Sequence, residues 1–432
     1  MSDNPASKTF WKSLGPGLLF AGAAVGVSHL VQSTRAGADF GLALVVVILF
    51  ANFFKYPGFQ FGPRYAAATG TSLLEGYRKQ GLWALVLFAL LTLATMFTVQ
   101  AAVTAMTGAL FAAVLGLTDP ILGQPPVVVF SALLTLLCAL LLVIGHYKWL
   151  DKIMKVVVLV LTLTTLVATV MVLPKLPWDS FALLPGGDYL FAAATALGLC
   201  GLIGWMPSAY DISIWHSLWT LARRRETGHA PSVRSALVDF DVGYIGTTVL
   251  GVMFLCMGAG VMFHSGQKFA PQPAAFAAQV ISLYTETLGA WMGPVVAISA
   301  FTVMFSTTLT VVDGFPRAIA TLVARFKGPE QPGVPDAANR FVYWGAIAVL
   351  GLGALVVIEF FGKSLPQMAD TATSLSLLTA APLAWLNHRA MTGPEVPAEA
   401  RPGPVMQAWS WLGIAVSVLL AGYYVWFKWL AG

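Results

Sequence analysis

The sequence predicts an all-α polytopic membrane protein, and three observations lead to that prediction. Hydrophobic residues make up 58% of the 432 residues, charged residues make up only 10%, and the mean hydropathy is +0.78. Soluble domains carry about a quarter charged residues. The apolar residues also gather into segments of about 20 residues or more, the length that crosses a bilayer. We therefore expect one transmembrane domain over residues 1–432, with the lipid bilayer as its main partner.

Eleven such segments follow one another along the chain. Their expected limits are residues 15–37, 41–69, 82–115, 126–146, 153–173, 188–220, 240–264, 288–324, 339–361, 364–387 and 408–429. Lys and Arg lie mainly at alternate segment ends, which predicts a cytoplasmic N-terminus and a C-terminus outside. The expected location is the plasma (inner) membrane. This arrangement of basic residues indicates membrane topology and not nucleic-acid binding.

The first segment is interrupted at its centre. An apolar run gives way to Gly26, Ser28, His29 and Gln32 at a depth where hydrocarbon is expected. Polar groups there are costly and usually line a cavity or a pathway. We interpret these four residues as one half of a substrate site that a broken helix forms.

The sixth segment has a matching interruption at Pro207. Proline removes a backbone donor and clashes with the preceding turn, so nearby carbonyl groups become free to face a ligand. A simple proline kink, with these carbonyls satisfied by Ser208 or by neighbouring helices, is the alternative. The expected binding residues on this side are Ile203, Trp205, Met206, Ser208 and Tyr210.

Each interrupted segment opens a run of five segments. The chain therefore divides into a first repeat at about 15–173, a second repeat at about 188–387 and an extra helix at about 408–429. Corresponding interruptions in two halves are typical of inverted-repeat transporters, whose binding site lies near the middle of the membrane. This division rests on hydropathy, because the two halves share no visible sequence identity.

Three ionisable residues within the segments are candidates for moving a coupling proton or sodium ion. Asp211 follows the second break, and His29 lies beside the first. Asp313 is the third, although Arg317 stands four residues further on, the spacing of an ion pair on one helix face. Intramembrane carboxylates and imidazoles are functional candidates by default. Lys55, in the second segment, is expected to contact a neighbouring helix or to snorkel to an interface.

Enzyme chemistry finds no support in the sequence. It contains no glycine-rich phosphate loop and no nucleophile elbow, and its His and Cys residues are not clustered at metal-binding spacings. Cys138, Cys200 and Cys256 stand far apart in apolar sequence. We therefore expect neither a disulfide framework nor a cofactor.

The residues around the breaks resemble the Nramp metal-ion transporter family. The resemblance includes GPG at Gly15–Gly17, ANFFKYPGFQFGPRYAAATG at Ala51–Gly70, the Met206–Pro207 break and STTLTVVDGF in the eighth segment. It covers nearly all of the chain. It implies a LeuT-type fold, which is a 5+5 inverted repeat with broken helices 1 and 6 plus an eleventh transmembrane helix, and a divalent metal ion as substrate.

Two departures from the family pattern concern the metal ligands. The family's Asp-Pro-Gly-Asn motif is replaced by Gly26-Val27-Ser28-His29, and its Met-Pro-His motif by Met206-Pro207-Ser208. A divalent ion needs several oxygen or nitrogen ligands and some compensation of its charge. A rebuilt metal site would depend on Met206 and His29. The hydroxyl, amide and aromatic groups at the breaks suit a small organic or anionic solute better.

The sequence therefore predicts a secondary active transporter that works by alternating access. Its substrate is either the divalent metal ion that the resemblance implies or a small organic or anionic solute carried on the same scaffold. A non-transporting membrane sensor is the alternative from another functional class. The sequence does not indicate the oligomeric state.

Overall fold

The protein is helical throughout its described part. The computed structural model describes residues 15–183, 193–265, 270, 273–332, 340–361 and 364–430, and the regular elements within them are helices. An isolated pairing of Ile121 with Gln124 is the one β-type contact of these residues. The all-α class is thus confirmed. Residues 188–192, where the sequence places the start of the sixth segment, lie outside the described part.

The expected segments correspond to helices in the same order. Their bounds are Pro16–Ala24, Ser28–Ser33 and Thr34–Phe40 for α2, η1 and α3, Val45–Thr69 for α4, Leu82–Leu115 for α6, Pro126–Val172 for α7, Ala193–Gly204 and Asp211–Thr227 for α9 and α10, Val233–Met262 for α11, Gly293–Lys327 for α13, Arg340–Phe361 for α14, Leu365–Met391 for α15 and Pro404–Val425 for α16. Among the described residues, eight segments are long and apolar enough to cross a membrane, and α2 with η1 and α3 makes a ninth, bent by 46°. The pair α9 and α10 and the helix α15 lie at the sixth and tenth expected segments, but they are not among these nine.

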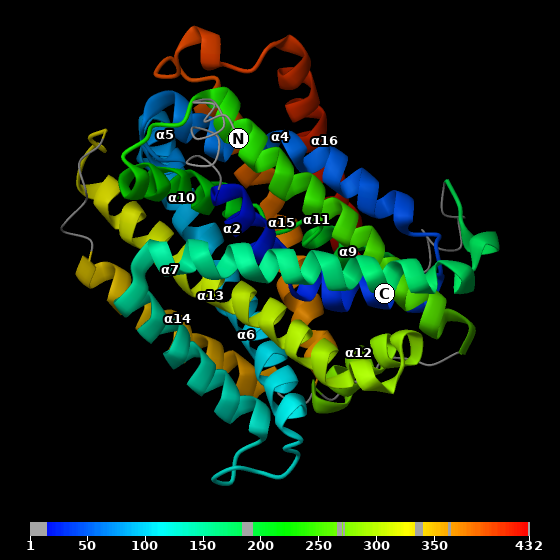
Figure 1. Ribbon diagram of the computed structural model, residues 1–432. Coiled ribbons are helices and arrows are strands. Elements are labelled where there is room, and N and C mark those ends of the chain that lie inside the picture. The colour runs from blue at the N-terminus through cyan, green and yellow to red at the C-terminus, as the bar shows by residue number, and fades with distance from the viewer. Residues whose placement is uncertain are drawn as a thin grey trace, which may run out of the picture.

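The fourth and fifth expected segments form one helix. α7 is continuous from Pro126 to Val172, yet it contains two spans, Pro126–Ile144 and Lys148–Lys175. In Figure 1 its teal and green parts run in different directions, so the chain turns back between the spans. The two expected spans are therefore present, with the division two residues before the predicted one, and the short polar stretch between them is assigned as helix.

Two shorter helices were not among the expected segments. α5 (Leu73–Gln80) connects α4 to α6, and α12 (Pro273–Leu288) lies between α11 and α13. α10 also extends to Thr227, which places the basic residues 223–225 on a helix end. Cationic side chains in the last turn interact favourably with the helix dipole.

The two broken helices lie inside the bundle, and α14 and α16 lie at its edge (Figure 1). In the spanning windows, 76% of the residues are buried in α13 but only 22% in α16. α11 packs against both halves of the first broken helix. A Cβ on Gly243 would lie 2.1 Å from the Gly17 carbonyl oxygen, and a Cβ on Gly258 would lie 2.0 Å from that of Thr34. Small residues allow such close approach between membrane helices.

Candidate functional site

The first break separates α2 from a π-helical turn. α2 ends at Ala24, and η1 begins at Ser28. Gly26 lies in the unwound stretch, where a Cβ would come within 2.8 Å of the hydroxyl and methyl groups of Thr307 on α13. Glycine is therefore required at position 26 by the close approach of α13.

Thr307 binds the carbonyl groups that this break leaves open. Its hydroxyl lies 2.8 Å from the carbonyl oxygen of Gly22 and 3.0 Å from that of Val25. The last carbonyls of a helix have no partner within the helix, and burial without one is costly. Thr307 was not among the predicted site residues, although the run Ser306–Thr308 in an apolar helix is a signal that could have pointed to it.

The second break also leaves carbonyl groups at a helix end, and a lysine binds them. α9 ends at Gly204 and α10 begins at Asp211. The Lys55 ammonium of α4 donates to the carbonyl oxygens of Ile203 and Gly204 at 2.6 and 3.0 Å. Lys55 is only 3% exposed, so it makes a helix contact and does not snorkel. The carbonyls predicted to face a ligand therefore face a lysine of the protein itself.

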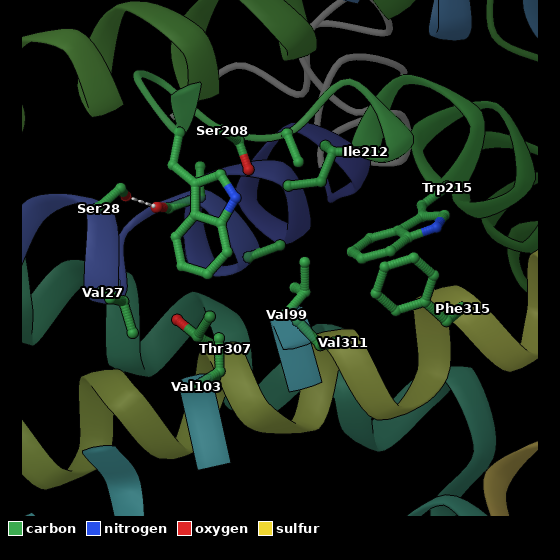
Figure 2. Close-up of a pocket in the computed structure, with 14 residues that line it drawn as sticks. Val27, Ser28, Val99, Val103, Ser208, Ile212, Trp215, Thr307, Val311 and Phe315 are labelled. Atoms are coloured by element: carbon green, nitrogen blue, oxygen red, sulfur yellow. Dashed lines mark hydrogen bonds between the residues drawn. The ribbon is translucent and has the colours of Figure 1, made fainter. Parts of the chain in front are cut away.

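A small cavity of about 30 Å³ lies between the two breaks, α6 and α13 (Figure 2). Its polar lining consists of the hydroxyl groups of Ser28, Ser208 and Thr307, and the rest of its lining is apolar or aromatic. The other lining residues are Ala23, Ala24, Val27, Val99, Val103, Trp205, Ala209, Ile212, Trp215, Val311 and Phe315. A water molecule needs about 10–15 Å³ measured in this way, so the cavity has room for about two.

Figure 2 shows how the cavity is built from distant parts of the chain. Val99 and Val103 come from α6, and Val311 and Phe315 come from α13. The indole nitrogen of Trp205 donates to the Ser376 hydroxyl of α15 at 2.7 Å, which fixes the ring as one wall. Ser28, Trp205 and Ser208 are the predicted binding residues that line the cavity.

The two predicted metal donors lie toward α11 instead. The ring of His29 contacts the Ser28 hydroxyl at 2.7 Å through Nδ1 and the Thr247 carbonyl at 2.9 Å through Nε2. The sulfur of Met206 lies 3.1 Å from the place that a Cβ on Gly251 would take. Neither residue lines the cavity. Among the described residues, no group of three or more His, Cys, Asp or Glu side chains could hold a metal ion.

Gln32 and Tyr210 also lie away from the cavity. Gln32 donates to Asp370 of α15 at 3.0 Å, and Asp370 forms an ion pair with Arg35 at 3.0 Å. Tyr210 stacks on Phe59 of α4 with ring centroids 4.7 Å apart. Both residues therefore join a broken helix to a neighbouring continuous one.

The two predicted carboxylates have opposite surroundings. Asp313 accepts hydrogen bonds from Arg317, Trp219 and Tyr343, and the ion pair suggested by the i, i+4 spacing is present. Asp211 is 1% exposed, and neither of its oxygens has a hydrogen-bond partner in the described part of the chain. Asp211 therefore remains available for proton or ion binding, whereas Asp313 joins α10, α13 and α14.

Comparisons with known proteins agree with this architecture. The family model for natural resistance-associated macrophage protein-like (Nramp) proteins matches residues 17–427. An uncharacterized protein of Pasteurella multocida (strain Pm70) is 35% identical over 390 residues, which cover 88% of this chain and 86% of that protein.

Solved structures share the fold at low sequence identity. A manganese transporter of Eremococcus coleocola, in complex with an aromatic bis-isothiourea substituted compound, gives a TM-score of 0.69 at 15% identity and covers 100% of this chain and 90% of its own. MhsT in complex with L-phenylalanine gives a TM-score of 0.61 at 13% identity, and the match covers 94% of this chain and 98% of MhsT. Mhp1, a nucleobase-cation-symport-1 family transporter with bromovinylhydantoin bound, gives a TM-score of 0.56 at 13% identity, and the match covers 96% of this chain and 92% of Mhp1. The chain therefore has the LeuT-type fold.

Proposed function

The chain belongs to the Nramp family, and from that premise we propose that it is a secondary active transporter of a small organic solute and not of a divalent metal ion. Family membership establishes an integral membrane transporter and not an enzyme. The proposal concerns the cargo. It rests mainly on the lining of the cavity between the breaks, which offers three hydroxyl groups and no charged or sulfur-containing side chain.

Ligand chemistry supports this choice of cargo. Hydroxyl groups without a carboxylate, imidazole or thioether beside them bind Mn²⁺ or Fe²⁺ weakly, and nothing in the lining compensates a double positive charge. Apolar walls with a few fixed polar groups are typical of sites for small organic molecules. The cavity of about 30 Å³ is closed to such a molecule and must widen to admit one. Two structures with the same fold hold organic molecules, namely L-phenylalanine in MhsT and bromovinylhydantoin in Mhp1.

Coupling to a proton through Asp211 is part of the proposal. A buried carboxyl group without a hydrogen-bond partner is stabilised by taking up a proton. His29 is the second candidate, because an imidazole can take up a proton. Its two ring contacts join the first break to α11. Sodium coupling remains the alternative for Asp211.

We also propose the orientation and the location. The distribution of Lys and Arg supports an N-terminus in the cytoplasm and a C-terminus outside, and we propose the plasma (inner) membrane as the location. The chain would act as a single transmembrane domain over residues 1–432.

Metal transport is the competing function, because a manganese transporter is among the structural neighbours. Proteoliposomes loaded with a metal-sensitive dye should show no saturable Mn²⁺ or Fe²⁺ uptake above that of empty liposomes. Saturable Mn²⁺ uptake that Met206→Ala abolishes and the control Met253→Ala preserves would refute the organic solute. A screen of small amino acids and heterocycles by thermal stabilisation should then find a ligand whose effect Ser208→Val removes. A sensor would bind such a ligand without moving it across the membrane.

A further inference from the structure

We infer that Lys55 is a resident cation of the second helix break, and that it closes this break to transported cations. The inference deepens the proposed function, because it assumes that the two breaks form the transport site. It starts from the position of the ammonium group, which donates to the carbonyl oxygens of Ile203 and Gly204 at 2.6 and 3.0 Å. These are the terminal carbonyls of α9.

The end of α9 is a place where a cation is expected. The C-terminal end of a helix carries about half a negative charge, and the effect is strong where water is excluded. In broken-helix transporters, unwound carbonyls and half-helix C-termini coordinate the transported ion. Here the side chain of Lys55 reaches that position from α4 and is only 3% exposed. A mobile cation would have to displace it.

Lys55 has no carboxylate partner within salt-bridge distance in the described residues. Besides the two carbonyls, the ring of Tyr210 lies 5.9 Å from its ammonium nitrogen, a cation–π contact. A buried charge needs compensation, and the dipole of α9 and this ring are the groups that supply it. The side chain of Lys55 therefore binds the carbonyl groups at the break and does not form an ion pair with a carboxylate of the described residues.

The opposite end of the break holds the residue to which the proposed function assigns the coupling proton. α10 begins with Asp211. The first break differs, because the neutral hydroxyl of Thr307 binds its carbonyls. With the end of α9 compensated by Lys55 and Asp211 assigned to the coupling proton, the cavity is left for an uncharged solute. This names the class of cargo more narrowly than the proposed function does.

Chemical rescue tests the inference without knowledge of the solute. Lys55→Ala leaves a space beside the two carbonyls that matches the removed propylammonium group, since alanine keeps the Cβ. We expect the purified variant to melt at a lower temperature than the wild type, and n-propylammonium chloride in tenfold excess over its Kd to raise the melting temperature by about 1–2 °C. The wild type and the surface variant Lys175→Ala should not respond to n-propylammonium.

Three further measurements test whether the positive charge of Lys55 is what matters. Equal rescue by uncharged n-propanol would overturn the inference, because it would show that Lys55 only fills space. No rescue by n-propylammonium would overturn it as well. If Lys55→Ala does not fold, Lys55→Arg and Lys55→Met replace it: Arg should melt close to the wild type and Met clearly lower, and equal melting temperatures would overturn the inference. Mn²⁺ uptake by the wild type would refute the proposed function and the closure of the break to cations, whereas the rescue result would still decide whether Lys55 is a resident cation.

Discussion

Each helix break in this transporter depends on one side chain from another helix. Thr307 of α13 binds the open carbonyls of α2, and Lys55 of α4 binds those of α9. In a bilayer, water cannot replace these partners, so an unsatisfied carbonyl costs several kcal/mol. Distant residues therefore contribute to the stability of both breaks, in addition to local contacts such as that of the Ser28 hydroxyl with the Ala24 carbonyl.

Replacing Thr307 by Val should destabilise the protein. The change keeps the shape of the side chain but leaves the carbonyls of Gly22 and Val25 without their donor, which costs about 1–3 kcal/mol. Thermal melting in detergent measures the loss. Thr302→Val is the matched control, because the Thr302 hydroxyl binds only a carbonyl of its own helix. Equal melting of the two variants would contradict this role of Thr307.

Asp211 and Asp313 should respond in opposite ways to conversion into Asn. Asp211 has no hydrogen-bond partner in the described structure, so Asp211→Asn should fold normally and lose the proton flux that a pH-sensitive dye reports in proteoliposomes. Asp313→Asn removes the buried negative charge that accepts hydrogen bonds from Arg317, Trp219 and Tyr343, so it should lower stability by about 1.5–3 kcal/mol. Proton flux that survives in Asp211→Asn would remove Asp211 as the carrier.

For individual residues, the sequence could not predict the direction in which a side chain points. His29 and Met206 occupy the positions of ligands in the family motifs, yet both lie toward α11, near Thr247 and Gly251. Hydrophobic periodicity assigns a residue to a face of its own helix. At the breaks the helix is unwound, so the periodicity does not tell where the side chains point. Lys55 was expected to contact a neighbouring helix, and only the packing of α4 against α9 reveals which carbonyls it binds.

Among the elements, α11 determines how the first broken helix is held. It contacts α2 through Gly243 and α3 through Gly258, in both cases backbone against backbone. α11 therefore acts as a common support for two half-helices that have no continuous backbone ladder between them. Close contact of this kind leaves no space for a methyl group.

Gly243→Ala should disrupt this contact. Its new Cβ would lie 2.1 Å from the Gly17 carbonyl oxygen, so the backbones must separate at a cost of at least about 1–3 kcal/mol. Gly246→Ala is the control on the same helix, since a Cβ there meets no atom within 4 Å. Alanine at that position should stabilise the helix by about 0.5–1 kcal/mol. Fluorescence-detected gel filtration after heating compares the two, and equal loss in both would contradict the packing role.

Hydropathy predicted most elements, and its errors have physical causes. Both breaks were predicted within a few residues, because glycine, proline and clustered polar residues rarely interrupt an apolar run unless the helix is broken there. The two spans within α7 were predicted, but the polar stretch between them, which was expected to separate two helices, is itself helical. α12 was missed because a 16-residue helix is too short to count as a span.

On the scale of the whole molecule, the two halves of the first broken helix are tied down by two different carboxylates. Asp239 of α11 accepts from the backbone N–H groups of Gly15 and Gly17 at 2.9 and 2.7 Å, at the start of α2. Asp370 of α15 binds Arg35 and Gln32 beside α3, at the other end of the helix. Alternating access requires each half-helix to be released on its own side while the other stays closed.

Each carboxylate should therefore control access from one side only. Ser208→Cys places a thiol on the cavity wall, where Ser208 is 8% exposed, and the native Cys138, Cys200 and Cys256 are buried. Hydrogen bonds to a charged group contribute about 1.5–3 kcal/mol, so the loss of one should raise the open population about tenfold or more. In that background, Asp239→Asn should speed labelling by a membrane-impermeant thiosulfonate from the side of the membrane where α2 begins. Asp370→Asn should speed it only from the opposite side. Faster labelling from both sides in either variant would mean that the two half-helices do not move independently, and the LeuT-type mechanism would then not apply to this chain.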